Sequence, residues 1–162
     1  MYGKDIDTVR PIASITNIMT GMVIMDAGLD MEEDIVSADQ ARDCIRMPGS
    51  RLSVGATLQR RELLLLALMS SENRAAAALG RTYPGGLERF VVAMNSKAAS
   101  LGMYNSQFAD PAGLNADNVS TASDLARMLA AAQGYPMITD ATTTLHRDVQ
   151  PYASRGPLTF NN

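Results

Sequence analysis

The sequence predicts a mainly α-helical fold, and three observations lead to this prediction. Aromatic residues make up only 5% of the 162 residues while Leu, Ala, Met and Val are abundant, a balance that favours packed helices over a β-sandwich or barrel. Apolar residues recur at helical spacing in several segments. Because 46% of the residues are hydrophobic and neither a repeat nor a long linker is present, we expect one domain over residues 1–162.

The first expected helix begins just after Ser14 and ends before Gly28. Its apolar residues follow the i, i+3, i+4, i+7, i+8 pattern of one helix face. They are Ile15, Ile18, Met19, Met22 and Val23. Since Ile24 and Met25 widen this face, we expect the helix to be central and mostly buried.

The next segment, residues 29–56, loses helical periodicity and is expected to form a long irregular connection. Short strands are expected around Ile45 and over residues 51–54. A second helix is expected from Leu58 to Met69, and its last seven residues are apolar on all sides, which predicts burial on every face. It should break at Ser70 and Ser71.

Three further helices and a short one complete the expected fold. They cover residues 75–79, 87–101, 121–133 and 137–141. The second of them carries a clean amphipathic pattern and ends at Gly102, a typical helix terminator. A capping-box pattern opens the third at Thr121. The remaining residues read as a polar tail.

Charge and hydropathy exclude two classes of partner. The net charge is -3 with a sequence pI near 5.1, and no basic stripe is present, so we expect no nucleic-acid partner. The longest apolar run, residues 63–69, is far too short to cross a bilayer. No basic-then-apolar leader opens the chain, so any export signal is expected to have been removed.

No motif predicts a cofactor or a metal. Phosphate-loop and dinucleotide fingerprints are absent, and the single cysteine, Cys44, allows neither an internal disulfide nor a multi-cysteine metal site. The single histidine, His146, lies near Asp148, but no nucleophile-elbow motif accompanies it. We therefore interpret His146 as a surface residue rather than as part of a Ser-His-Asp triad.

Two hydroxyl-bearing motifs stand at expected helix boundaries. Ser14 lies at the start of the buried helix, where backbone N–H groups and the helix dipole favour an attacking alkoxide or an oxyanion. Asn17 is one turn further on, and Ser71-Glu-Asn73 lies where one buried helix ends and another begins. Taken singly, each serine is more simply explained as a helix cap.

Together these motifs resemble a known family. The segments are Arg10-Pro-Ile-Ala-Ser14-Ile-Thr-Asn17, Leu64 to Asn73, and Pro111-Ala-Gly-Leu114. They resemble, in the same order, motifs of the low-molecular-mass penicillin-binding proteins of the serine D-Ala-D-Ala peptidase family. Tyr83-Pro-Gly-Gly86 and the segment 94–103 are similar to its D-alanyl-D-alanine endopeptidase branch.

The resemblance implies a fold. Members of the family have an α/β serine β-lactamase/DD-peptidase-like fold with a five-stranded sheet and a Lys-Thr-Gly motif on a flanking strand. That motif would follow the last residue of this chain. We therefore expect residues 1–162 to form a single partial domain, the helical part of this fold, with much of the sheet missing.

The resemblance also implies roles for four residues. Ser14 would be the nucleophile of the Ser-x-x-Lys motif, Ser71 would relay a proton toward the leaving group, and Asn73 would hold the substrate peptide. Asn17 occupies the position of the general-base lysine. An amide can orient Ser14 by a hydrogen bond but cannot accept its proton. The only lysines, Lys4 and Lys97, form no alternative motif.

The implied activity is hydrolysis of peptidoglycan cross-links through a serine acyl-enzyme in the periplasm. Peptidoglycan peptides and β-lactams would be its ligands, and no cofactor would be needed. Without the lysine and the Lys-Thr-Gly motif, we expect this activity to be impaired or lost. Two alternatives remain: a non-catalytic module that binds peptidoglycan or a partner, and a truncated remnant that covers an exposed apolar helix by self-association.

Overall fold

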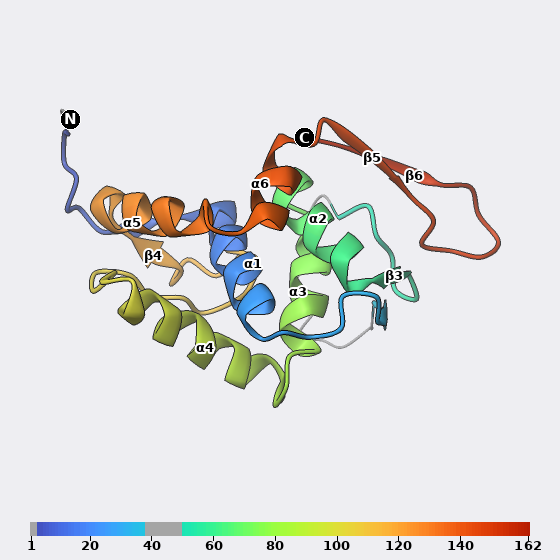
Figure 1. Cartoon of the computed structure of the whole chain (residues 1–162), viewed down its shortest axis with the longest axis horizontal. Coiled ribbons are helices and arrows are strands. Elements are labelled where there is room, and N and C mark those ends of the chain that lie inside the picture. The colour runs from blue at the N-terminus through green and yellow to red at the C-terminus, as the bar shows by residue number, and fades with distance from the viewer. Residues whose placement is uncertain (1–2, 38–49) are drawn as a thin grey trace.

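The computed structural model describes residues 3–37 and 50–162, and within them most regular structure is helical (Figure 1). The prediction of a mainly α fold is confirmed. The helices are η1 (Ala13–Ile15), α1 (Thr16–Asp26), α2 (Arg60–Ser70), α3 (Asn73–Arg81), α4 (Gly86–Ser100), α5 (Ala122–Ala132) and α6 (Pro136–Thr143).

The strands of the described part are short and form antiparallel pairs only. They are β1 (Arg10–Pro11) with β4 (Val119–Ser120), β2 (Asp34–Val36) with β3 (Thr57–Gln59), and β5 (His146–Val149) with β6 (Leu158–Asn161). The last pair replaces the expected polar tail, and Figure 1 shows it extending away from the helices. Its strands were not predicted because only Val149 and Phe160 are buried, too few for an alternating pattern.

Two expectations in the connection after α1 have different outcomes. Residues 51–54 form no strand. Their backbone is instead anchored by side chains, since Tyr152 accepts a hydrogen bond from the Ser53 N–H at 2.7 Å. Cys44 and the strand expected around Ile45 lie outside the described residues.

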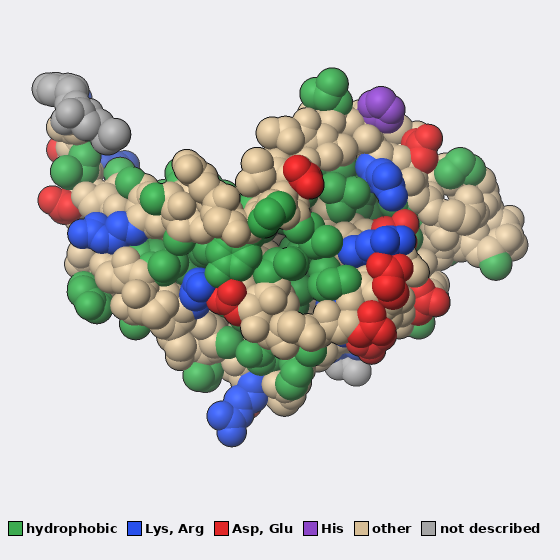
Figure 2. All heavy atoms as spheres, viewed as in Figure 1, with side chains coloured by type: hydrophobic (Ala, Val, Ile, Leu, Met, Phe, Trp, Pro, Cys, Tyr) green, Lys and Arg blue, Asp and Glu red, His purple; other side chains and the backbone are tan. Residues whose placement is uncertain are grey.

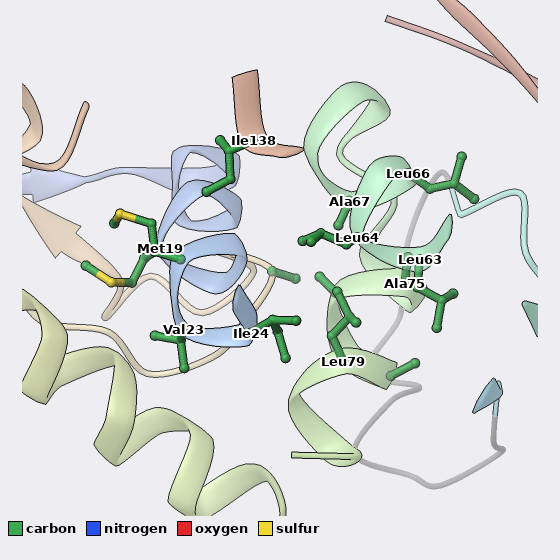
Figure 3. Packing of buried hydrophobic residues seen from close by; sticks show 14 of the residues in the cluster. Met19, Val23, Ile24, Leu63, Leu64, Leu66, Ala67, Ala75, Leu79 and Ile138 are labelled. Atoms are coloured by element: carbon green, nitrogen blue, oxygen red, sulfur yellow. The ribbon is translucent and has the colours of Figure 1, made fainter. Parts of the chain in front are cut away.

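Helix α1 is central, as predicted, and contacts α2, α3, α4, α5 and α6. Figure 3 shows Ile24 facing Leu64 of α2 and Leu79 of α3, whereas Met19 points to the opposite side of α1. All four of these side chains are fully buried. Helix α1 is thus fixed in a core shared by most of the helices.

Helix α2 begins at a capping box and carries a buried cation. Gln59 and Glu62 exchange the two hydrogen bonds of the box. The Arg60 side chain lies inside the fold, where Nε donates to the Asp30 carbonyl at 3.1 Å and a terminal nitrogen pairs with Glu33. Arg60 therefore ties the connection after α1 to the start of α2.

The amphipathic pattern predicted for α4 is confirmed. Phe90, Met94 and Ala98 are buried on its inner face, while Val92 points outward and is 57% exposed. Phe90 also meets Tyr83 edge to face, with ring centroids 5.2 Å apart.

In the described part of the chain, no helix is both long and apolar enough to cross a membrane. Figure 2 shows hydrophobic side chains gathered across the middle of one face, with charged groups on either side of them.

Candidate active site

Ser14 is exposed and lies in the single turn η1, which directly precedes α1. The preceding residue, Ala13, has φ +46°, a left-handed conformation that is disfavoured for a residue with a side chain. Such strain persists only where neighbouring structure imposes it, and it is common next to reactive groups. The turn presents Ser14 at the N-terminal end of α1.

A second segment lies against this turn. The Ile12 N–H donates to the Asn118 carbonyl at 3.0 Å, and the Thr20 hydroxyl donates to the Pro111 carbonyl at 2.7 Å. Residues on both sides of Ser14 are therefore bonded to the segment 110–118.

Asn17 lies below Ser14 in the first turn of α1 and is only 3% exposed. Among the described residues, neither its amide nitrogen nor its amide oxygen has a hydrogen-bond partner, and neither does the buried Thr16 hydroxyl. The hydrogen bond by which Asn17 could orient Ser14 is therefore not formed. A polar side chain is buried here without compensation, which normally costs stability.

Replacing this amide by an apolar group of similar shape should stabilise the fold. We expect Asn17→Leu to raise the free energy of unfolding by about 1–3 kcal/mol, because the desolvation penalty of two unpaired atoms disappears. Urea denaturation measures this change.

Asn95 provides the matched control. Its amide nitrogen donates to the carbonyls of Val91 and Phe108 at 2.9 and 2.8 Å, and its oxygen accepts from the Phe108 N–H at 3.0 Å. Asn95→Leu should therefore destabilise the fold. A loss of stability in Asn17→Leu comparable to that in Asn95→Leu would contradict the expectation.

Ser71 and Asn73 occupy the junction of α2 and α3. Ser71 is exposed and left-handed, with φ +52° and ψ +41°, and Asn73 is half-buried as the first residue of α3. This backbone conformation ends α2 abruptly and turns the chain into α3. The junction is thus a second strained turn that carries a candidate residue.

Glu72 fixes this junction, and sequence reasoning gave it no role. Its buried carboxylate accepts from the Ala75 N–H at 2.8 Å, which caps α3, and it also accepts from the Ser50 hydroxyl and the Leu52 N–H. An acidic residue just before an expected helix was the available signal, because carboxylates favour helix N-termini.

The elements that carry these residues share one core, since α1 packs against both α2 and α3. Within the residues that the structure describes, no hydrogen bond joins Ser14 to Ser71 or to Asn73. His146 is exposed on β5, consistent with its interpretation as a surface residue.

Lys97 is engaged with partners away from Ser14. Its Nζ donates to Asp26 at 2.7 Å and to the Tyr135 hydroxyl at 2.8 Å. Burial alone would lower the pKa of Lys97, but these hydrogen bonds and the Asp26 charge outweigh it and raise the pKa, which keeps the amine protonated. Asp26 ends α1, whereas Ser14 precedes it, so the cation lies at the opposite end of that helix.

A hollow of about 700 Å³ lies elsewhere on the molecule, and its walls include Asp34, Gln59, Glu62 and Tyr152. It contains none of the candidate residues. In the described segments, no group of three or more His, Cys, Asp or Glu side chains could hold a metal ion.

Comparison with known proteins identifies the class. Residues 1–155 match the family of D-alanyl-D-alanine carboxypeptidases known as Peptidase_S11. The chain belongs to this peptidase family.

Its relatives include enzymes of the endopeptidase branch. The D-alanyl-D-alanine endopeptidase of Pseudomonas aeruginosa is 48% identical over 162 residues, which is 100% of this chain and 52% of the relative. The D-alanyl-D-alanine endopeptidase of Escherichia coli is 49% identical over 147 residues, which is 89% of this chain and 46% of the relative. The chain thus spans about half the length of these curated relatives.

Solved structures confirm the predicted DD-peptidase fold. The Streptomyces K15 DD-transpeptidase superposes with a TM-score of 0.88 at 26% identity, covering 99% of this chain and 67% of the transpeptidase. A D-alanyl-D-alanine carboxypeptidase from Mycobacterium tuberculosis gives 0.87 at 28% identity, covering 100% of this chain and 61% of the carboxypeptidase. The chain thus superposes on about two thirds of each of these structures.

Proposed function

We propose that this chain is the nucleophile-bearing part of a serine D-alanyl-D-alanine endopeptidase whose acyl transfer to Ser14 is strongly impaired. The observation that carries the proposal is Asn17, buried and without a hydrogen-bond partner at the position where the family motif has lysine. The identity to the two endopeptidases supports the substrate class, the peptide cross-links of periplasmic peptidoglycan.

The first chemical step explains the impairment. Ser14 Oγ attacks a D-Ala carbonyl carbon, the hydroxyl proton must leave, and the new oxyanion needs hydrogen-bond donors. The exposed turn before α1 suits the attack, since the helix dipole favours negative charge there. No base accepts the proton, because the Asn17 amide lone pair is delocalised and Lys97 is paired at the far end of α1.

Ser71 and Asn73 would act on the substrate from the other turn. In this proposal the Ser71 hydroxyl, which is exposed, passes a proton to the leaving amine, and the half-buried Asn73 amide holds the peptide. Glu72 keeps both residues in place by capping α3.

Labelling by a fluorescent penicillin tests the proposal, because the drug acylates the same serine that would attack the peptide. We expect slow or no labelling of the natural chain and about 10²- to 10⁴-fold faster labelling of Asn17→Lys. Asn17→Met, of similar length but without an amine, should stay slow, and Ser14→Ala in the Asn17→Lys background should abolish labelling. Rapid stoichiometric labelling of Ser14 in the natural chain would overturn the proposed impairment.

A second candidate function is binding of peptidoglycan without catalysis. It is favoured by the exposure of Ser71 on a junction that Glu72 holds rigidly. Titration with a muropeptide decides between the two: no binding at millimolar ligand removes this candidate.

A further inference from the structure

The turn that presents Ser14 contains a strained residue. Ala13 adopts φ +46°, which an alanine avoids unless its surroundings impose it. Within the turn, the Ile15 N–H donates to the Ile12 carbonyl at 3.2 Å and the Thr16 N–H donates to the Ala13 carbonyl. These bonds are those of an ordinary helical turn and do not by themselves require a left-handed Ala13, so further restraint is expected from the residues that pack on the turn.

Gly113 packs directly on this turn. A Cβ atom at position 113 would lie 1.9 Å from the Ala13 carbonyl oxygen, 2.4 Å from its carbon and 2.9 Å from the Thr16 hydroxyl oxygen. The backbone of residue 113 thus rests directly on the peptide that joins Ala13 to Ser14. Gly113 itself has φ +79°, so only glycine satisfies both the conformation and the approach.

The segment that carries Gly113 is rigid because of one side chain. The Asp110 carboxylate accepts from the N–H groups of Ala112 at 2.7 Å and Gly113 at 2.6 Å, and also from those of Leu114 and Asn115. The fully buried Asn118 donates its amide N–H to the same carboxylate at 2.8 Å. Gly113 therefore rests on the Ser14 turn as part of a fixed loop.

Two further bonds hold the loop and the turn together. Pro111 accepts the Thr20 hydroxyl, one turn of α1 beyond Thr16, and Asn118 accepts the Ile12 N–H. The loop is thus fastened on both sides of Ala13 and Ser14.

We propose that Gly113 is a positioning residue for Ser14: its bare backbone holds the Ala13–Ser14 peptide in the left-handed turn that places the Ser14 side chain at the N-terminus of α1. This inference rests on the proposed function only for the importance of Ser14. The geometry of the Ser14 turn does not depend on that function.

The test measures that geometry without requiring catalysis. In a Ser14→Cys, Cys44→Ser background, iodoacetamide alkylation is followed as a function of pH, because a thiol held at a helix N-terminus ionises at lower pH than a free one. Gly113→Ala should slow alkylation at pH 7 about tenfold and move the midpoint of the profile up by about one pH unit.

Gly86 supplies the matched control. It also has φ +79°, but a Cβ there would meet nothing within 4 Å, so Gly86→Ala introduces the same backbone strain without the collision. Its alkylation profile should equal that of the parent. If folded Gly113→Ala gives the same profile as Gly86→Ala, the glycine has only a packing role and the proposal is overturned.

A milder pair of variants applies if Gly113→Ala does not fold. Thr20→Val removes only the bond to Pro111 and should slow alkylation several-fold, and Thr20→Ser should restore it because the hydroxyl returns. Equal rates in both variants would count against the proposal. Penicillin labelling stays an independent readout, so a failure of the proposed activity cannot be mistaken for a failure of this positioning role.

Discussion

Phe90→Ala is expected to lower the free energy of unfolding by about 3–5 kcal/mol, the range for removing a large aromatic side chain from a packed core. The ring has no exposed surface and fills the space between α3 and α4. A Cβ at Gly80 of α3 would lie only 3.2 Å from it. The loss of its edge-to-face contact with Tyr83 adds to the cavity cost.

Val92→Ala is the control on the same helix. Because Val92 is 57% exposed, its truncation should change the unfolding free energy by less than about 0.5 kcal/mol. Urea denaturation of the parent and of the two variants measures both effects, provided that the three m-values are equal. Similar losses for the two variants would show that α4 does not bury the face described above.

Arg60→Met is expected to lower the free energy of unfolding by about 2–4 kcal/mol, because buried acceptors lose their donor. The Arg60 side chain is 2% exposed. It donates hydrogen bonds to the Asp30 carbonyl, to the Glu33 carboxylate and, at 3.4 Å, to the Thr82 hydroxyl. Methionine retains the apolar stem but no donor. Water can solvate Glu33, which is 54% exposed, so the Asp30 carbonyl should account for much of the loss.

The neighbouring Arg61 is the control for the effect of burial on Arg60. Arg61 pairs with Glu32 at 2.9 Å, but the two side chains are 49% and 57% exposed. Arg61→Met should therefore cost no more than about 1 kcal/mol. Thermal unfolding at neutral pH separates the two variants. Equal shifts of Tm would refute the conclusion that the buried Arg60 links the connection after α1 to the start of α2.

The helices could be predicted because their information is local. The apolar spacing over residues 15–25 specified α1, and Thr121 caps α5 as expected, accepting the Asp124 N–H at 3.1 Å. The strands were missed because they contain two to four residues each, too few to show a period of two.

The residues of the candidate site were likewise predictable only where their signal is local in the sequence. Ser14 and Ser71 were found because each stands where a helical pattern begins or ends. Their supports were not found, since Gly113, Asp110 and Glu72 act on partners that are distant in sequence or through backbone atoms. The unpaired state of the Asn17 amide was equally out of reach, because it depends on which neighbours the fold supplies.

The contact between the Ser14 turn and the loop that carries Gly113 also sets an order of events during synthesis. Thr20 and Pro111, which fasten the two, are 91 positions apart, so the ribosome makes the serine long before it makes the loop. Bringing such distant segments together carries a loop-closure entropy, and domains fold as units once their chain is complete. A nascent chain that has not yet reached residue 113 therefore carries Ser14 without the restraint that shapes its turn. The geometry around the serine is thus acquired only after residue 113 has been added to the chain.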